Sequence, residues 1–394
     1  MIARNLRHLR LFLAVADLAS VTRASDLYNI SQPAVTQALG KLESQAGGAL
    51  FTRTRQGFFL TGRGEALAGR ASRAFERLDR EMAAISPRLQ LTATAAQLSA
   101  LIATVATENF TLAARRLGLS QPTVHRAVSQ LEQEAEAPLF QRSAHGLIAT
   151  RPCQDLARAA QLAFAELAQA EADLAEFDGR EAGGIVIGSL PLARSVLLPQ
   201  ALARFRQRRA TLPVRVIDGL YDELLAGLRR GEIDVMIGAL RNPAPIGDVV
   251  QEPLFEDGLA FVAAPGHPLA RRARLRPADL GDRAWVVPRA GTPAREGFER
   301  FFGAAGQPLP PSILEAGSIL LMRELLLRGD FLGCISAHQA AAEISRGLLD
   351  RLDIEENLPG RPIGLTFREG WIPTAAQAEM LDLLRQGVAD LDRL

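Results

Sequence analysis

Two segments of the sequence carry side chains that can form hydrogen bonds with the edges of DNA bases. They begin at Ser31-Gln32-Pro33 and at Ser120-Gln121-Pro122. Glutamine can form two hydrogen bonds with adenine, arginine can do the same with guanine, and a threonine methyl group can contact thymine. The residues expected at bases are Ser31, Gln32, Pro33, Ala34, Thr36, Gln37 and Lys41 in the first segment, and Gln121, Thr123, His125, Arg126 and Gln130 in the second. Four arginines, Arg53, Arg55, Arg63 and Arg142, suit phosphate groups, which position a protein on DNA without specifying its sequence.

These side chains need a rigid frame, and the apolar residues around the first segment predict one. Apolar residues recur at helical spacing in 9–16 and again in 35–42. Between the two helices, Asn29 tolerates a positive φ and Ser31 suits the N-cap of the second helix. A helix, a tight turn and a capped helix make a helix-turn-helix, whose second helix enters the major groove. The apolar run from Leu50 returns through a glycine, which is typical of a two-stranded wing.

The sequence contains this unit twice, at an offset of 89 residues. Fourteen of 38 aligned positions are identical between residues 24–61 and 113–150. The similarity continues into the following helices, where residues 67–78 and 156–167 share their apolar spacing. We infer from the sequence that a complete supersecondary unit and the helix after it were duplicated.

The motif in both copies resembles that of the LysR-type transcriptional regulators. It consists of a small residue, Ser-Gln-Pro-Ala-Val, Leu-Glu, Leu-Phe-x-Arg and a final Thr, and the second copy has Thr123 in place of the motif's alanine. The resemblance implies a winged helix-turn-helix that binds double-stranded DNA, a linker helix and a C-terminal effector-binding domain. That last domain is similar to the galactose-binding-protein-regulator type. The usual family member has one winged domain, so the second copy is a departure.

The two copies differ in charge. Residues 1–90 contain 13 basic and 7 acidic side chains, residues 91–180 contain 7 and 10, and the rest brings the chain to +1. The first copy is therefore expected to be the main DNA reader. In the second copy, Glu132, Glu134 and Glu136 would repel a phosphate backbone or face a protein partner. That copy is either a weaker reader or a partner of the first within the chain.

From Gly183 onward, short apolar runs alternate with helical segments. The runs are 185–187, 214–217, 233–237, 285–287, 312–314 and 331–335, and the chain returns through 363–367 into a final helix from about Thr374. The alternation predicts βαβ units with parallel sheets. Two such lobes, crossed twice by the chain, form a periplasmic-binding-protein-like module with a ligand cleft at the carboxyl ends of its strands.

The ends of these runs indicate which residues line the cleft. They are Ser189, Leu190, Pro191, Arg194, Tyr221, Ala239 and Arg241 in the first lobe, Arg289, Gly291, Thr292, Ser318 and Ile319 in the second, and Thr366 on the return strand. Backbone N–H groups at helix starts, together with hydroxyl and guanidinium groups, suit a carboxylate, an aromatic acid or a sugar.

The expected fold class is therefore mixed, with two largely α-helical winged domains before an α/β two-lobe effector domain. The expected boundaries are 1–62 for the first winged domain, 63–90 for its linker helix, 91–151 for the second winged domain, 152–181 for its linker helix and 182–394 for the effector domain. Within the effector domain, lobe I comprises about 182–257 and 364–394 and lobe II about 258–363.

The sequence gives little support for catalysis. It lacks a Gly-x-Ser-x-Gly elbow, a His-Glu-x-x-His motif and a phosphate-binding loop, so no enzyme, cofactor or metal site is predicted. Cys153 and Cys334 are interpreted as ordinary small core residues rather than redox sensors. Without a leader or a long uncharged apolar segment, the chain is expected to be cytoplasmic. The alternatives are a ligand-independent architectural or repressor protein and a DNA-tethered enzyme.

The resemblance also implies an assembly. Family members pair through antiparallel linker helices, so one chain with two linker helices can form a pseudo-dimer by itself. Two chains joined through their effector domains would then carry four winged domains and two sensors, where a usual tetramer has four of each. RNA polymerase is a further expected partner if the protein activates transcription.

Overall fold

The chain forms two compact units, residues 1–184 and 185–394. The computed structural model describes residues 2, 5–143, 146–195, 197–241, 243–244, 246–355 and 360–391. Within this described part, no helix is both long and apolar enough to cross a bilayer.

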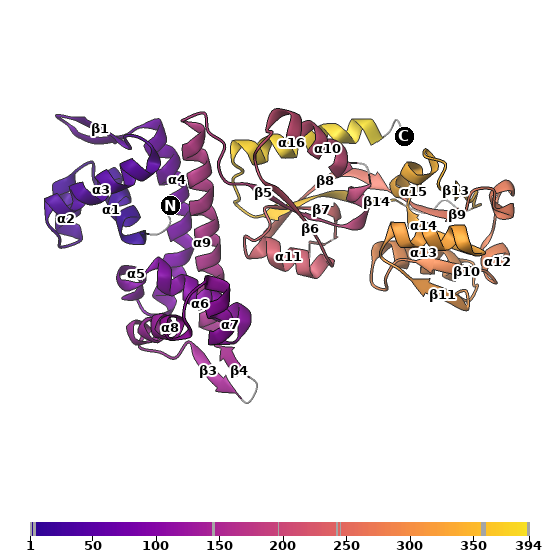
Figure 1. Ribbon diagram of the computed structural model, residues 1–394, viewed down its shortest axis with the longest axis horizontal. Coiled ribbons are helices and arrows are strands. Elements are labelled where there is room, and N and C mark those ends of the chain that lie inside the picture. Colours follow the sequence, from indigo (N-terminus) through magenta and orange to yellow (C-terminus); the bar gives the residue numbers. More distant parts are fainter. Residues whose placement is uncertain are drawn as a thin grey trace. The chain divides into compact units, whose positions relative to one another are not determined.

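The N-terminal unit begins with three helices and a hairpin (Figure 1). They are α1 (Leu6–Leu18), α2 (Val21–Leu27), α3 (Gln32–Ala46) and the antiparallel strands β1 (Phe51–Thr54) and β2 (Gly57–Leu60). The Ser31 hydroxyl accepts a hydrogen bond from the backbone N–H of Ala34, which fixes the start of α3. Before it, Asn29 has a φ of 50°, as the turn chemistry predicts.

A second set with the same order of elements follows. It comprises α6 (Ala95–Thr107), α7 (Phe110–Leu117), α8 (Gln121–Ala135), β3 (Phe140–Ser143) and β4 (Gly146–Ala149). Gly118 takes the positive φ of 66° in its turn, and the Ser120 hydroxyl caps α8 by accepting from Thr123 N–H. The local interactions that begin α3 therefore recur at the start of α8.

The hairpins are attached to the first helices in the same way. Gly57 and Gly146 have φ values of 137° and 138°. A Cβ atom at Gly57 would lie 2.5 Å from the carbonyl oxygen of Ala19, which accepts a 3.0 Å hydrogen bond from Phe58 N–H. In the second set, the corresponding bond runs from Leu147 N–H to the Glu108 carbonyl at 3.0 Å. Both glycines thus allow close approach of two backbones.

Each hairpin leads into a long helix, α4 (Gly62–Ile85) or α9 (Arg151–Glu176), and the short α5 (Leu89–Thr92) follows α4. Helices α4 and α9 lie side by side (Figure 1), and their apolar faces share one core. That core includes the repeated residues Leu67, Ala71, Ala74, Phe75 and Leu78 and their counterparts Leu156, Ala160, Ala163 and Leu167, with Phe164 packed against it.

The C-terminal unit contains two five-stranded sheets. The first has the order β6 (Val214–Asp218), β5 (Ile185–Ser189), β7 (Val235–Ala239), β14 (Arg361–Arg368) and β8 (Val249–Asp257). Strands β5, β6 and β7 are parallel, whereas β14 is antiparallel to both of its neighbours. Helices α10 (Leu197–Arg208) and α16 (Ala375–Leu391) cover one face and α11 (Tyr221–Arg229) covers the other (Figure 1). The 3₁₀ turn η2 (Pro191–Arg194) follows β5.

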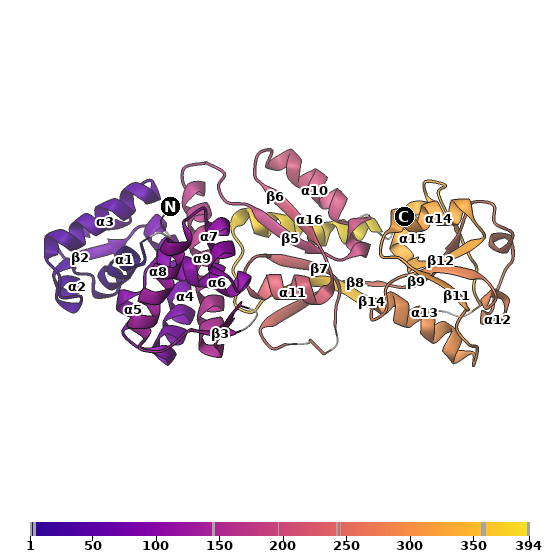
Figure 2. The same cartoon turned by 60° about the horizontal axis from the view of Figure 1, so that its bottom comes forward.

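The second sheet has the order β11 (Ser312–Glu315), β10 (Ala284–Val287), β12 (Phe331–Ser336), β9 (Leu259–Ala263) and β13 (Asp350–Arg351). Helix α13 (Pro293–Ala304) packs on one face, and α14 (Ile319–Arg328) and α15 (Ala337–Ile344) pack on the other (Figure 2). Smaller helical turns are η3 (Pro268–Arg271) and α12 (Pro277–Leu280). The chain passes between the lobes at 257–259 and again before β14. The two mixed α/β sheets agree with the predicted two-lobe architecture.

Three described strands of the C-terminal unit, β8, β9 and β13, are not among the runs predicted from the sequence. In strand β8, polar and charged pairs and Pro253 interrupt the apolar residues, so its sequence does not form one apolar run. It lies at the edge of its sheet, where the missing N–H group of a proline is tolerated.

Candidate nucleic-acid interface and effector cavity

Helix α3 exposes its predicted DNA-contacting face. Val35, Leu39 and Leu42 are buried in the core of the N-terminal unit. The exposed residues include Ser31, Gln32, Pro33, Ala34, Thr36, Gln37 and Lys41. A polar face at the N-terminal end of the second helix is the part of a helix-turn-helix that reaches base edges.

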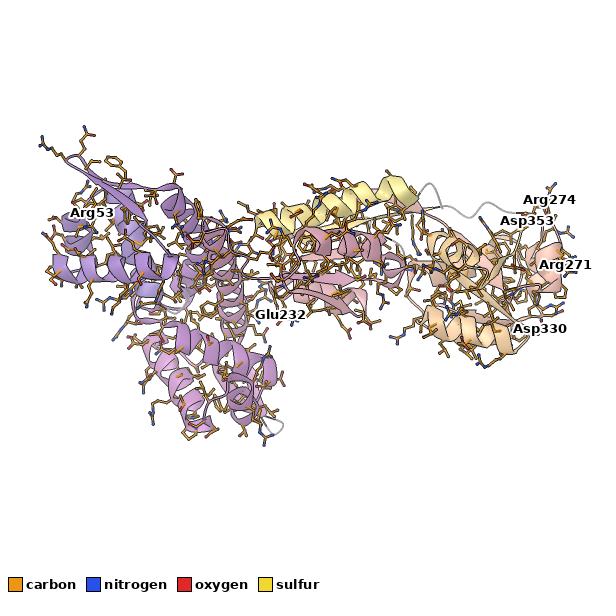
Figure 3. The ribbon with its side chains drawn as sticks, turned by 45° about the horizontal axis from the view of Figure 1, so that its top comes forward. Arg53, Glu232, Arg271, Arg274, Asp330 and Asp353 are labelled. Carbon is orange, nitrogen blue, oxygen red and sulfur yellow. The ribbon has the colours of Figure 1, made fainter. Side chains whose placement is uncertain are left out.

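The first hairpin carries two exposed arginines. Arg53 lies on β1 and Arg55 in the turn after it. The guanidinium of Arg53, labelled in Figure 3, lies 5.5 Å from the centre of the Phe58 ring, within reach of a cation–π contact. Both arginines suit phosphate contacts, and this assignment stays a prediction.

Arg63 does not fit the expected role of a phosphate contact. Its guanidinium donates to Asp178 Oδ1 at 2.6 Å and to the Ala46 carbonyl at 2.6 Å, and its side chain is only 13% exposed. It also lies 5.3 Å from the centre of the Phe177 ring. These contacts tie the C-terminal end of α3 to the end of α9. The guanidinium of Arg63 is therefore engaged in hydrogen bonds within the N-terminal unit. The side chains of Arg63 and Arg180 lower the pKa of Asp178 to about 2.

Helix α8 presents a different set of side chains on the same kind of face. Val124, Val128 and Leu131 are buried. The exposed residues include Gln121, Thr123, His125, Arg126 and Gln130. The ring of His125 packs edge-on against Phe110 at a centroid distance of 5.0 Å. The Arg142 side chain lies outside the described residues.

The three glutamates at the end of α8 are engaged within the N-terminal unit. Glu132 Oε1 accepts from the backbone N–H of Leu139 at 2.9 Å, just as Glu43 Oε1 accepts from Leu50 N–H at 3.0 Å in the first set. Arg88 lies 2.8 Å from Glu134 and 3.8 Å from Glu136. Glu132 thus holds the start of the hairpin and Glu134 pairs with the linker, while the expectation that the three carboxylates repel a phosphate backbone or face a protein partner stays a prediction.

Helices α4 and α9 are joined by a buried ionic network. Arg70, whose side chain is 3% exposed, donates to Asp173 Oδ2 at 2.8 Å and to Gln169 Oε1 at 2.7 Å. Its guanidinium and that of Arg73 both lie 3.3 Å from Glu166. Together with the Arg63–Asp178 pair, these contacts show that the two helices run antiparallel, because later residues of α4 meet earlier residues of α9.

In lobe I, the predicted effector residues gather around the ends of β5 and β7. Ser189 is fully buried and Leu190 donates its N–H to the Ile237 carbonyl at 3.0 Å. The Arg241 guanidinium lies 4.8 Å from the centre of the Tyr221 ring. Burial raises the pKa of Tyr221, whose hydroxyl has no hydrogen-bond partner among the described residues. The other residues expected here are Pro191 and Arg194 in η2 and Ala239 at the end of β7.

The predicted residues of lobe II occupy helix starts. The Thr292 hydroxyl caps α13 and donates to the Arg289 carbonyl at 2.7 Å, and the Ser318 hydroxyl caps α14 directly before Ile319. Arg289 and Gly291 are exposed. None of these five residues lines the cavity described next.

Thr366 is not a cleft residue. It is 2% exposed and pairs with Met236 on one side and Gln251 on the other, inside the sheet. Because β14 runs antiparallel to β7, the residue beside the end of β7 is Ile363, which pairs with Ala239. It is therefore the first residue of β14, Arg361, and not its last residues, that lies toward the second lobe.

A cavity of about 270 Å³ lies between the two lobes. It is lined by Leu240, Arg241, Asp257, Gly258, Leu259, Pro293, Glu296, Gly297, Arg300, Gly360 and Arg361. Both crossings of the chain therefore border it. Of the predicted effector residues, only Arg241 belongs to this lining. Asp257 and Arg361 were missed for different reasons. Asp257 ends β8, which the sequence pattern does not reveal, and Arg361 begins β14 two residues before the predicted run 363–367.

Asp257 and Arg361 are neighbouring charged residues in the lining of the cavity. Asp257 is 1% exposed, and its Oδ1 atom accepts from the His338 backbone N–H at 3.2 Å and contacts the ring Nδ1 at 2.7 Å. Its Oδ2 atom lies 3.7 Å from the Arg361 guanidinium. Asp257 Oδ2 and Arg361 Nε have no hydrogen-bond partner among the described residues. Burial lowers the pKa of Arg361. A bound ligand could satisfy these groups.

The two cysteines are buried in the cores of their units. Burial raises the pKa of Cys153 to about 12 and also raises that of Cys334. Since the thiolate is the reactive form, both are inert at neutral pH.

Helix-turn-helix elements with an exposed polar second helix, together with a two-lobed α/β module around a cavity, define a transcriptional regulator that senses a small molecule. The model of the LysR substrate binding domain matches residues 178–389. The model of the bacterial regulatory helix-turn-helix protein, lysR family, matches residues 6–65 and again residues 95–154. The chain belongs to the LysR family. It is not an enzyme but a DNA-binding regulator, and an effector controls it.

Similar proteins support this assignment. The HTH-type transcriptional regulator GalR of Pseudomonas putida is 36% identical over 396 residues, which cover 98% of each chain. The regulator CbbR of Xanthobacter flavus is 32% identical over 304 residues, covering 76% of this chain and 89% of its own. A full-length OxyR variant of Pseudomonas aeruginosa, at 20% identity and a TM-score of 0.54, covers 75% of this chain and 94% of its own. Full-length CbnR in complex with its target DNA is also 20% identical and has a TM-score of 0.51. The match covers 74% of this chain and 98% of the CbnR chain. The last two show likeness of fold.

Proposed function

We propose that both winged units of this chain read DNA and that their linker helices pair within the chain. Two chains joined through their effector domains then place four winged units on DNA under the control of two sensors. Such a regulator acts in the cytoplasm, where its DNA lies, and contacts RNA polymerase if it activates transcription.

The observation that carries the proposal is the equivalence of the two frames. The second unit has the Ser120 cap, the Gly146 approach and the Glu132 bond that correspond to Ser31, Gly57 and Glu43 in the first. On this frame it exposes its own Gln, Thr, His and Arg side chains. A unit retained only as a structural cap has no need of such a face.

The lengths over which relatives align with this chain support the duplication. GalR of Pseudomonas putida aligns along nearly all of both chains, so that relative is similarly long. CbbR matches over most of its own length yet leaves about a quarter of this chain unmatched. That remainder is close to one repeated unit in size.

The charges on the linker helices favour pairing of α4 with α9. Asp173 and Glu166, which bind Arg70 and Arg73 of α4, correspond at the 89-residue offset to Ala84 and Arg77 in α4 itself. Two α4 helices from different chains, paired in the same way, would bring arginines to arginines. Two α9 helices would leave their carboxylates without these partners. Like charges in contact disfavour the first pairing, and the loss of the arginine partners disfavours the second.

Light scattering of the full chain tests this assembly. A stable species of two chains is expected, and a stable tetramer would overturn it. Unfolding of the N-terminal unit should not depend on protein concentration if α4 and α9 pair within one chain, whereas exchange of helices between chains would make it concentration-dependent. The second unit is tested by Arg126→Ala, which should weaken binding to operator DNA, and unchanged affinity would indicate a structural cap.

We also propose that the interlobe cavity binds the effector and that the effector is an anion. Its lining contains three arginines, Arg241, Arg300 and Arg361, and two acidic residues, Asp257 and Glu296. Guanidinium groups form paired hydrogen bonds with carboxylates, and Arg361 Nε has none within the described protein. A carboxylate or aromatic acid fits this lining better than a neutral sugar.

Thermal shift with benzoate, succinate and glucose as probes tests the effector assignment. Acids are expected to stabilise the full chain and to lose that effect in Arg361→Gln and Arg241→Gln. Stabilisation by glucose alone would overturn the anionic assignment. If a broad metabolite panel gives no shift, the ligand-independent repressor becomes the better description.

A further inference from the structure

The two recognition helices differ at the positions that specify bases. At the 89-residue offset, Gln37 corresponds to Arg126 and Lys41 to Gln130. All four side chains are exposed. Within each helix, the two residues are separated by one helical turn and lie on the same face. The neighbouring pair Gln32 and Gln121, by contrast, is identical.

The chemistry of these positions is reversed between the helices. Glutamine pairs best with adenine, whereas arginine and lysine pair best with guanine. Helix α3 therefore carries an adenine reader followed by a guanine reader, and α8 carries a guanine reader followed by an adenine reader. His125, where α3 has Thr36, adds a further difference and is held in place against Phe110.

Because the two winged units pair within one chain, their two different recognition helices are presented together to one DNA site. A dimer of identical winged domains presents the same helix to both half-sites, and its operator is palindromic. Here the pair consists of α3 and α8, tied by the Arg70 network on linker helices of one chain. One chain thus presents two unlike reading surfaces.

We infer that one chain recognises a directional, non-palindromic operator with two unlike half-sites. Gln37 and Lys41 specify one half-site, and Arg126 and Gln130 specify the other. This rests on the proposed function, since it requires that the second unit reads DNA. Each chain consequently has a defined direction on its operator.

Selection of bound sequences from random double-stranded DNA with the full chain tests the inference. The motif expected for each chain has two half-sites that are not inverted copies of each other, with A favoured opposite Gln37 and G opposite Arg126, and a dimer of chains should bind two such motifs. The wrong base at either position should lower affinity by about 5- to 150-fold, equivalent to roughly 1–3 kcal/mol.

Two substitutions sharpen the test. Gln37→Arg should move the motif toward symmetry with G in both half-sites, and Arg126→Gln should move it toward symmetry with A in both. Ser44→Ala, exposed on the last turn of α3, is the matched control and should leave the motif unchanged.

The outcomes separate the inference from the function on which it rests. A wild-type motif with two identical half-sites, or a motif that Arg126→Gln leaves unaltered, overturns the inference. A hydroxyl-radical footprint that protects a single half-site instead overturns the proposal that the second unit reads DNA. Unlike half-sites that both respond to their substitutions support the two together.

Discussion

Replacing Arg70 with alanine should destabilise the N-terminal unit while leaving the C-terminal unit unaffected. Arg70 is buried at the contact of α4 with α9, and its guanidinium reaches Asp173, Gln169 and Glu166 at 2.8, 2.7 and 3.3 Å. Removal of the cation takes this counter-charge away from both carboxylates. It also leaves Gln169, which is 7% exposed, without this hydrogen bond.

The magnitude follows from burial. Breaking one side of a buried ion pair costs about 3–5 kcal/mol, because the remaining charge stays desolvated. Asp173 and Glu166 retain 21% and 17% exposure, so water can partly hydrate them after the substitution. We therefore expect a loss near the lower end, about 3 kcal/mol. With a urea m-value of about 1–3 kcal/mol per M, the midpoint should fall by roughly 1–3 M.

Urea unfolding with two probes isolates the effect. Both tryptophans, Trp285 and Trp371, belong to the C-terminal unit, so their fluorescence reports that unit alone. Far-UV circular dichroism also follows the helical N-terminal unit. Arg80→Ala is the matched control, because Arg80 lies on the same helix, is 70% exposed and is 3.9 Å from Glu76, where about 0.5 kcal/mol or less is expected. Equal shifts for the two variants, or a parallel shift of the tryptophan transition, would refute the reasoning.

Three further predictions concern other parts of the chain. Gly57→Ala should lower the free energy of unfolding by more than about 1 kcal/mol, because the new Cβ meets the Ala19 carbonyl at a φ of 137°, whereas Gly69→Ala within α4 should not; urea denaturation compares them. The pKa of Asp178 is depressed to about 2, so its contribution to stability is present above about pH 4 and lost as the pH falls toward 2; Asp178→Asn should flatten the acid dependence of the thermal midpoint in this range. A thiol-specific chromogenic reagent should react with neither Cys153 nor Cys334 until urea unfolds the chain, and a thiol titrating in the native protein would contradict the burial argument.

The repeated residues could be recognised from sequence because local chemistry dictates their roles. A serine before a helix, a residue tolerant of positive φ in the turn and a glycine in the hairpin act through neighbours that are close in the chain. Glu43 and Glu132 extend this to hydrogen bonds only seven residues away, at Leu50 and Leu139. Such short-range bonds explain why the identities between the copies fall where they do.

The residues that sequence patterns misplaced depend on distant partners. From the sequence, Arg63 resembles a phosphate contact, but in the structure it binds the carboxylate of Asp178, which lies 115 residues later in the chain. Thr366 lies inside its sheet because the antiparallel register of β14 places Ile363, not Thr366, next to the end of β7. Asp257 and Arg361 meet across more than 100 residues of chain, and only the three-dimensional fold brings them to one cavity.

The charge difference between the two copies has a structural origin in these pairs. Of the charged groups in residues 1–90, Arg63, Arg70, Arg73 and Arg88 bind carboxylates of the second copy and its linker, namely Glu134, Glu136, Glu166, Asp173 and Asp178. Without these four arginines and five carboxylates, residues 1–90 hold nine basic and seven acidic groups and residues 91–180 hold seven and five. Both copies then have the same excess of two positive charges. The overall asymmetry therefore marks which helices pair, and it gives no reason to assign DNA binding to the first unit alone.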